Sequence, residues 1–275
     1  MLLSTVIRLE PLEPVKLPVH LGRAAHAWFL KLALSDADPV MAALLHDRSA
    51  DRPFTVSDVL GGHPAGANQR WFRPGEKATL RITTLTEPLT RFMLRQKQRG
   101  ALRQIRLGGG VFQVREMFQD ASGHPWAGMD RFETLLQKYW EPENPPASLS
   151  LRFASPTVFR SNQVYLPLPV PRLVFEGLYR RWNRFALQEI PEEFLSFAAD
   201  SLVIRDFQIR SRRVHIKKGD AWREIPGFVG ACTFGAVVPE RYWLRWTHLL
   251  AAFARYAGVG KNTAMGLGQT RLLAD

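Results

Sequence analysis

The chain has 275 residues, 46% of them hydrophobic and 23% charged, so it is long enough to bury one large or two medium cores. Its 37 lysines and arginines against 25 acidic residues give a formal net charge of +12, which is typical of a protein that binds nucleic acid. The single cysteine, Cys232, excludes an intramolecular disulfide, and no apolar run has the length of a signal peptide or a membrane span, so we expect a cytoplasmic protein that binds no membrane.

The first half of the chain alternates between strand and helix patterns. Short apolar or alternating runs predict strands, and apolar residues at spacings of three and four predict helices. In chain order we predict a strand at residues 5–9, helices at 21–34 and 39–46, strands at 54–60 and 78–85, a basic helix at 87–104, and strands at 105–107 and 111–118. This is a βαββαβ-like order.

A proline-rich segment at residues 141–146 separates this half from a second one, because its three prolines exclude a helix or a central strand. Strand and helix patterns then follow again, at residues 149–153, 171–186, 201–208, 212–217, 228–237, 242–256 and 267–273. We therefore predict an α+β fold of two tandem ferredoxin-like domains, residues 1–146 and 147–275. The formal net charge is +4 for the first and +8 for the second.

A glycine-rich loop, residues 257–269, joins the last predicted helix to the last predicted strand. Glycine allows backbone N–H groups to approach an anion closely and permits the positive φ values that direct successive amides into one concavity. We predict a phosphate-contacting loop, and a structural turn is the alternative. The predicted contacts are Gly258, Gly260, Lys261, Asn262, Thr263, Gly266 and Gly268.

Two nucleotide-binding motifs do not fit this loop. A mononucleotide P-loop needs glycine where Arg255 stands, serine or threonine where Asn262 stands, and a strand in place of the preceding helix. The dinucleotide fingerprint needs a third glycine where Thr263 stands, and a helix after it. A nucleotide-binding protein is therefore a weaker alternative.

Six short motifs follow one another in the second half: FASPTVFR at residues 153–160, LPLP at 166–169, RWN at 181–183, GFVG at 227–230, FARYAGVG at 253–260 and GLGQ at 266–269. Their order and spacing resemble those of the CRISPR-associated pre-crRNA processing endoribonucleases of the RAMP superfamily. The first half is similar to that family more loosely, through its layout of strand, helix and histidine.

The resemblance implies a tandem ferredoxin-like fold that binds CRISPR repeat RNA and cuts precursor crRNA within each repeat without a metal or another cofactor. It leaves open a homodimer and association with subunits of a CRISPR effector complex. A non-catalytic RNA-binding RAMP subunit of such a complex is the alternative function. The presence of His46 and His26 favours the enzyme.

Cleavage of RNA without a metal makes definite demands on side chains. The ribose 2′-hydroxyl attacks the adjacent phosphate, so the site needs a base for that proton, an acid for the departing 5′-oxygen and a cation for the charged intermediate. The fragments then carry a 5′-hydroxyl and a 2′,3′-cyclic phosphate. Histidine suits both proton roles near neutral pH.

His46 is the first candidate, because it ends the short predicted helix and because the family places its catalytic histidine in this region; Asp47 beside it is placed to orient the ring. His26 on the first helix is the second candidate, and Arg52 is the candidate cation. Many relatives have a tyrosine and a lysine at roughly these two places. The alternative for each histidine is a structural role, and His20 is interpreted as a loop residue. No His-x-x-x-His or Cys-x-x-Cys spacing predicts a metal site.

Basic residues outside the glycine-rich loop extend the predicted RNA-binding surface. A spacing of four places four arginines on one stripe of the predicted basic helix, where a solvated face is the alternative: Arg91, Arg95, Arg99 and Arg103. A second basic cluster lies at a predicted hairpin that in the family approaches the repeat stem: Arg210, Arg212, Arg213 and Lys217. Phosphates and shape should dominate there, because side chains cannot read bases in the narrow major groove of A-form RNA.

Overall fold

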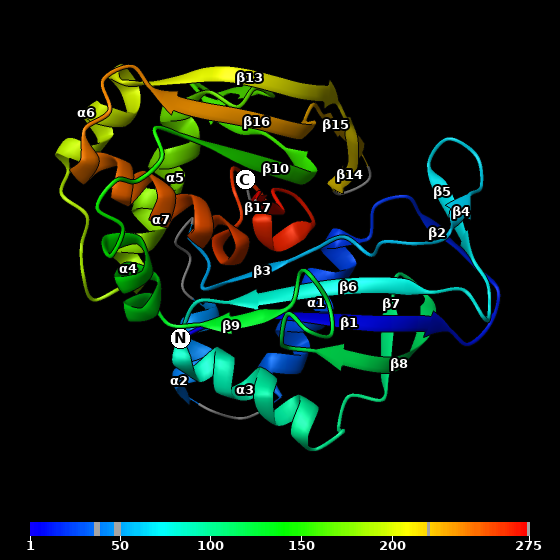
Figure 1. Cartoon of the computed structure of the whole chain (residues 1–275). Coiled ribbons are helices and arrows are strands. Elements are labelled where there is room, and N and C mark those ends of the chain that lie inside the picture. The colour runs from blue at the N-terminus through cyan, green and yellow to red at the C-terminus, as the bar shows by residue number, and fades with distance from the viewer. Residues whose placement is uncertain (36–38, 47–50, 219–220, 274–275) are drawn as a thin grey trace. The chain divides into compact units, whose positions relative to one another are not determined.

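The computed structural model of the chain describes residues 1–35, 39–46, 51–218 and 221–273; the side chains of residues 39, 40, 42, 46, 216–218 and 221–223 lie outside the described set. The chain forms two compact units (Figure 1). Unit 1 consists of Met1–Met129 with the short segment Ala264–Gly266, and unit 2 of Asp130–Thr263 with Leu267–Asp275. Among the described helices, none is both long enough and apolar enough to cross a membrane.

Unit 1 is built on an antiparallel sheet with a βαββαβ order of elements. The strand order β3-β6-β1-β8-β7 places the first strand of that motif between the third and the fourth, as in a ferredoxin-like fold. The motif consists of β1 (Leu2–Pro11), α1 (Gly22–Leu34), β3 (Phe54–Val56), β6 (Ala78–Thr84), α3 (Glu87–Gln98) and β8 (Gly110–Phe118).

Smaller elements complete this part of the chain. The edge strand β7 (Gln104–Leu107) pairs with β8, and β9 (Gly128–Asp130) pairs with β1. The helix α2 (Pro39–His46) follows α1. A separate three-stranded sheet has the order β2-β5-β4 and consists of β2 (Val15–Pro18), β4 (His63–Pro64) and β5 (Gln69–Phe72).

The core of unit 1 lies between the main sheet and its helices. Alternate side chains of β1, among them Leu3 and Ile7, point to one face and are fully buried with residues of α1 and α3. In α1 the buried Ala25, Phe29 and Ala33 recur every four residues, which is the spacing of one helix face. This face fixes which side of α1 is left for other contacts.

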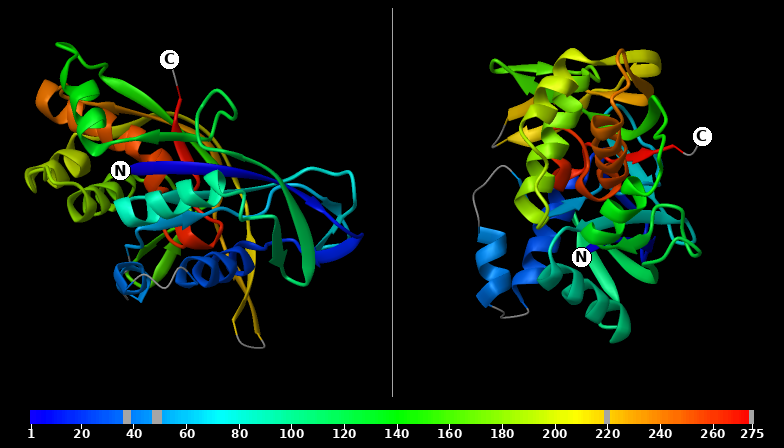
Figure 2. Two further views of the ribbon diagram at one scale, coloured as in Figure 1. Left: turned by 90° about the horizontal axis from the view of Figure 1, so that it is seen from below. Right: turned by 60° about the vertical axis from the view of Figure 1, so that its left-hand side comes forward.

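Unit 2 repeats the same motif, with the strand order β13-β16-β10-β17. Its elements are β10 (Ser148–Thr157), α5 (Pro171–Phe185), β13 (Leu202–Ser211), β16 (Phe228–Ala236), α7 (Arg241–Ala257) and β17 (Thr270–Leu272). The helices α5 and α7 lie side by side (Figure 2). The prediction of two tandem ferredoxin-like folds is therefore confirmed, whereas the predicted boundary at residue 146 stays a prediction.

Aromatic rings fill the core of unit 2. Phe175 of α5 meets Phe234 of β16 edge to face at 5.5 Å, and Trp182 of α5 meets Phe253 of α7 in the same manner at 5.3 Å. Additional elements surround the motif: α4 (Phe132–Trp140), α6 (Glu193–Asp200), the hairpins β11 (Phe159–Ser161)–β12 (Val164–Leu166) and β14 (Val214–Lys218)–β15 (Ala221–Ile225), and the 3₁₀ turn η1 (Thr263–Met265).

The basic helix α3 is shorter than predicted. It ends at Gln98, and Gly100 has a φ of +55°, a left-handed conformation that commonly stops a helix. Its amide donates to the carbonyl of Lys97 at 3.1 Å. Arg99 is therefore the cap residue and Arg103 lies beyond the helix, so the predicted place of Arg103 on the helical stripe is wrong. The RNA contacts predicted for these arginines stay predictions.

Candidate functional site

His26 lies on α1 beside the buried face of that helix. Its ring is stacked on Phe54 of β3, with ring centroids 5.7 Å apart and an interplanar angle of 23°. The carbonyl of Ala264, in the segment that returns to unit 1, accepts a hydrogen bond from the ring. The other ring nitrogen, Nδ1, is buried and has no hydrogen-bond partner. One nitrogen thus carries the proton and the other a lone pair.

The environment favours the neutral form of this histidine. Burial lowers the pKa of His26 below its ordinary value, the Ala264 carbonyl offsets part of that effect, and the positive charges of Arg52 and Arg23 lower the pKa further. A neutral imidazole at pH 7 can accept a proton, which is what a general base must do.

Arg52 and the end of α2 lie in the same region of unit 1. The Nη1 of Arg52 donates to the carbonyl of Leu45 at 3.0 Å, in the last turn of α2, and its charge acts on His26. The backbone of His46 ends α2, but the His46 side chain and all of Asp47 lie outside the described residues. The structure thus brings together His26, Arg52 and the backbone next to His46.

The segment Ala264–Gly266 is held to unit 1 by several hydrogen bonds. The Gly266 amide donates to the Val56 carbonyl at 2.9 Å, and the Met265 carbonyl lies 3.1 Å from Nε2 of His20. An added Cβ on Gly266 would lie 2.8 Å from Cε1 of His20, and one on Gly22 would lie 2.1 Å from the Met265 oxygen. The middle of the glycine-rich loop therefore packs closely against the start of α1.

The remaining glycines of the loop have structural reasons within unit 2. Gly260 has a φ of +81°, and an added Cβ would lie 2.5 Å from the carbonyl oxygen of Val158. Gly268 has a φ of +69°, with its Cβ position 2.1 Å from the carbonyl oxygen of Val259. Several loop amides also donate within the protein: Gly258 to Ala254, Val259 to Gly268, Lys261 to Val158 and Gly268 to Pro156, at 2.8–3.0 Å. These four amides already have acceptors.

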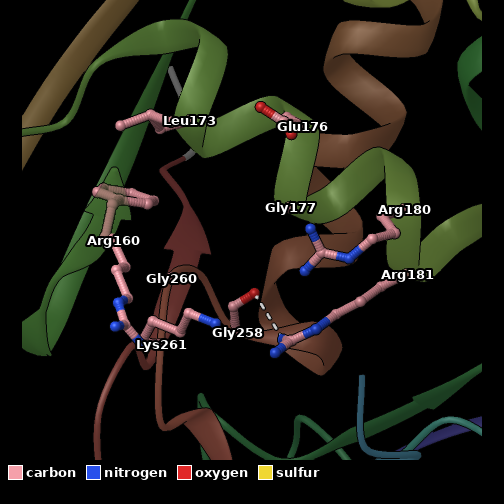
Figure 3. A pocket seen from close by; sticks show the side chains of 10 residues that line it. Arg160, Leu173, Glu176, Gly177, Arg180, Arg181, Gly258, Gly260 and Lys261 are labelled. Carbon is pink, nitrogen blue, oxygen red and sulfur yellow. Dashed lines mark hydrogen bonds between the residues drawn. The ribbon is translucent and has the colours of Figure 1, made fainter. Parts of the chain in front are cut away.

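A basic pocket of about 150 Å³ opens beside this loop in unit 2 (Figure 3). Its exposed cations come from three elements: Arg160 from β11, Arg180 from α5 and Lys261 from the loop. Gly177 of α5 also lines the pocket and has no atom within 4 Å of its missing Cβ, so the space above it is open. One acidic residue, Glu176, lines it as well. The cations outnumber the acid, so the pocket suits an anion.

Arg181, the neighbour of Arg180, is 6% exposed and is bonded to the loop itself. Its Nη1 donates to the carbonyl of Gly258 at 3.3 Å (Figure 3) and to that of Ala257. Its Nη2 donates to the hydroxyl of Thr263 at 2.8 Å. Arg181 therefore holds the backbone at the start of the loop and the side chain of Thr263 in place. The predicted contact Thr263 is 3% exposed and faces this arginine, whereas Asn262, with a φ of +58°, is half-buried.

The other predicted RNA-contacting arginines lie on the surface of their own units. Arg91 pairs with Glu87 one turn away, and Arg213 lies 3.2 Å from Glu224 across the β14–β15 hairpin. Arg210 and Arg212 are exposed at the base of that hairpin, while the Lys217 side chain lies outside the described residues. Arg99 and Arg103 are exposed next to the end of α3, and Arg95 is half-buried within it.

Sequence reasoning missed two cations of the basic pocket, Arg160 and Arg180, although both stand in or next to motifs that carry the resemblance. For Arg180 a signal was present, because Leu173, Gly177 and Arg180 recur at spacings of four and three along one face of α5. Among the described residues, no group of three or more histidine, cysteine, aspartate or glutamate side chains is arranged to hold a metal ion.

Two family models match the chain in tandem. The model of the CRISPR Cas6 N-terminal domain matches residues 1–137, and the model of the CRISPR-associated endoribonuclease Cas6 matches residues 151–270. A curated relative, the CRISPR-associated endoribonuclease Cas6 of Streptococcus thermophilus, is 29% identical over 147 residues. The match covers 51% of this chain and 56% of that protein, so the chain spans about half the length of this curated relative.

Solved structures match over the whole chain. The Cas6 protein in one solved product complex is 30% identical in sequence to this chain, with a TM-score of 0.75. The match covers 99% of each of the two chains. The product complex of a Thermus thermophilus Cas6 is 26% identical, with a TM-score of 0.79 and the same coverage.

Proposed function

The chain belongs to the family of CRISPR-associated endoribonucleases Cas6, and we propose that it is an endoribonuclease that binds CRISPR repeat RNA and cleaves precursor crRNA within the repeats. The observation that carries this proposal is the similarity to a Cas6 product complex over 99% of both chains. The neutral, half-buried His26 beside Arg52 and the end of α2 gives the proposal a local chemical basis.

The reaction needs no metal and breaks one P–O bond. One of the two candidate histidines, His26 or His46, accepts the proton of the ribose 2′-hydroxyl, whose oxygen attacks the adjacent phosphorus. The bond from phosphorus to the 5′-oxygen breaks, and that oxygen takes a proton from the other histidine of the pair. Arg52 stabilises the extra negative charge on the phosphate. The fragments carry a 2′,3′-cyclic phosphate and a 5′-hydroxyl.

The RNA backbone contacts side chains of unit 2 more than loop amides. The amides of Gly258, Lys261 and Gly268 donate within the protein, whereas the Arg160, Arg180 and Lys261 side chains are exposed around the basic pocket. Arginine and lysine neutralise phosphates and release counterions, which makes such binding strongly dependent on salt. The arginines of the β14–β15 hairpin extend this surface. A homodimer, association with effector-complex subunits and a cytoplasmic location stay predictions.

The direct test uses synthetic RNA copies of a CRISPR repeat with flanking spacer sequence, incubated with the protein in excess chelator. We expect one cut per repeat, with a 2′,3′-cyclic phosphate on the upstream fragment and a 5′-hydroxyl on the downstream one. Tight binding to the repeat without any cut would support the alternative, a non-catalytic RNA-binding subunit. Cutting that requires added Mg²⁺ would contradict the mechanism.

A further inference from the structure

The His20 ring lies between a carboxylate and a backbone carbonyl of unit 1. Its Nδ1 is 3.0 Å from Oδ2 of Asp58, and its Nε2 is 3.1 Å from the carbonyl oxygen of Met265. The His20 side chain is 9% exposed. Oδ1 of Asp58 accepts hydrogen bonds from the amides of Leu21, at 2.7 Å, and Val59, at 2.9 Å. These two backbone hydrogen bonds hold the carboxylate in its orientation toward the ring.

We propose that His20 and Asp58 form a positioning pair, in which a protonated His20 fastens the glycine-rich segment Ala264–Gly266 beside His26. His20 and Asp58 do not contact the reacting atoms of the RNA. The pair acts through the segment, and the part of the inference that concerns the cleavage rate rests on the function proposed above.

The hydrogen-bond partners of the His20 ring favour its protonated form. Both partners of His20, the Asp58 carboxylate and the Met265 carbonyl, accept hydrogen bonds and donate none. A neutral imidazole has a single N–H, so one of the two contacts would join two acceptors. The imidazolium donates to both.

The charges around the ring act in opposite directions. Burial disfavours the charged ring. The positive charge of Arg70, whose guanidinium lies 3.6 Å from Asp58, disfavours it as well. The hydrogen bond to Asp58, the negative charge of Asp58 and the hydrogen bond to the Met265 carbonyl together outweigh these two effects. The pKa of His20 is therefore raised above its ordinary value of 6.5. The stability that the pair contributes is fully present below pH 6.5 and is lost as the pH rises through the raised pKa.

Neighbouring residues of the segment Ala264–Gly266 contact His20 and His26. Met265 bonds to His20, and the carbonyl of its neighbour Ala264 accepts the hydrogen bond from the His26 ring. On the other side, Gly266 donates its amide to Val56 at 2.9 Å. A shift of Met265 therefore moves the group that sets the tautomer and position of His26.

The substitution Asp58→Asn separates charge from geometry. In that variant the amide oxygen can keep the bonds from Leu21 and Val59, while the amide nitrogen takes the place of Oδ2 and donates to Nδ1 of a neutral ring. Nε2–H still donates to Met265. We therefore expect Asp58→Asn to keep the segment in place and to remove its dependence on the protonation of His20. Asp58→Ala should lose both the bonds from the Leu21 and Val59 amides and the contact with the His20 ring.

Two measurements on the protein without RNA test the pair. Nuclear magnetic resonance titration of His20 should give a pKa above 6.5 in the unaltered protein and a lower one in Asp58→Asn. Hydrogen exchange of the Gly266 amide should be about ten- to hundredfold less protected in His20→Ala, which is the loss expected for hydrogen bonds to a charged group. The amides between β1 and β6 should keep their protection in every variant, as an internal control.

A third measurement connects the pair to the proposed reaction. His20→Ala should lower the single-turnover rate on repeat RNA with affinity retained, whereas Asp58→Asn should keep most of the rate of the unaltered protein. Unchanged Gly266 protection in His20→Ala, or a His20 pKa at or below 6.5, would overturn the inference. Exchange and titration need no cleavage, so they decide it even if the protein cuts no RNA. If His20→Ala does not fold, the titration of the unaltered protein and of Asp58→Asn decides it.

Discussion

The change Gly260→Ala tests whether the glycines of the loop are required by packing. Gly260 has a φ of +81°, and a Cβ there would lie 2.5 Å from the carbonyl oxygen of Val158 and 3.3 Å from its carbon. The left-handed conformation costs an alanine about 1–2 kcal/mol. Forcing a backbone carbonyl aside costs about 1–3 kcal/mol more. Together we expect a loss of about 2–5 kcal/mol in the free energy of unfolding.

Gly177→Ala is the matched control, because Gly177 lines the same pocket but has no atom within 4 Å of its Cβ position. It lies inside α5, where alanine in place of glycine gains about 0.5–1 kcal/mol. Urea unfolding followed by circular dichroism should therefore shift the midpoint of the transition in opposite directions for the two variants.

Equal stability of Gly260→Ala and the unaltered protein would show that packing does not require a glycine at position 260. The result also decides how glycine variants are interpreted in RNA-binding assays. If Gly260→Val or Gly266→Val lose structure, a fall in RNA affinity does not show that the loop amides contact phosphate. The side chains around the basic pocket then provide the cleaner test.

The other predictions concern chemistry and charge. His46→Ala and His26→Ala should each lower the single-turnover rate by about 10²–10⁴ with repeat-RNA affinity nearly intact, and a normal rate in either variant would move the assignment to another residue. Lys261→Ala should weaken binding and flatten the slope of log affinity against log salt by about 0.7–0.9, whereas His46→Ala should leave the slope unchanged; equal slopes would remove Lys261 from the RNA contacts. Because the pKa of His26 is lowered, its contribution to stability is fully present above pH 6.5 and is lost as the pH falls through the lowered pKa. Unfolding of His26→Asn between pH 7 and about 5 should lack that part of the decline, and an identical decline would contradict the assigned protonation state.

The sequence allowed the fold to be predicted because its signals are local. Apolar residues at spacings of two or four mark β1, α1, α5 and α7, and the proline-rich residues 141–146 lie between the family-matched regions. Shorter elements escaped prediction: β4 has two residues and β9 three, which is too short for a periodic pattern to appear. The end of α3 was misplaced because the arginine spacing continues past Gly100, where the backbone turns left-handed.

Part of the candidate site could also be predicted from the sequence, and part depends on tertiary contacts. His26 and Arg52 were expected from their places in the chain, and the structure sets them in one region with the end of α2. The pairing of His20 with Asp58 joins residues 38 positions apart in two loops, and neither loop has a pattern that indicates the other. The commitment of loop amides to Ala254, Val158 and Pro156 depends on tertiary packing as well.

The most direct test of the proposed function is a repeat RNA that carries a single 2′-deoxyribose just upstream of the cut, compared in chelator with the all-ribose RNA. If the 2′-hydroxyl is the attacking group, the deoxy RNA should bind with nearly the same affinity and remain uncut, while the all-ribose RNA is cleaved to a 2′,3′-cyclic phosphate. Cleavage of the deoxy RNA at the normal rate and position would contradict attack by the 2′-hydroxyl.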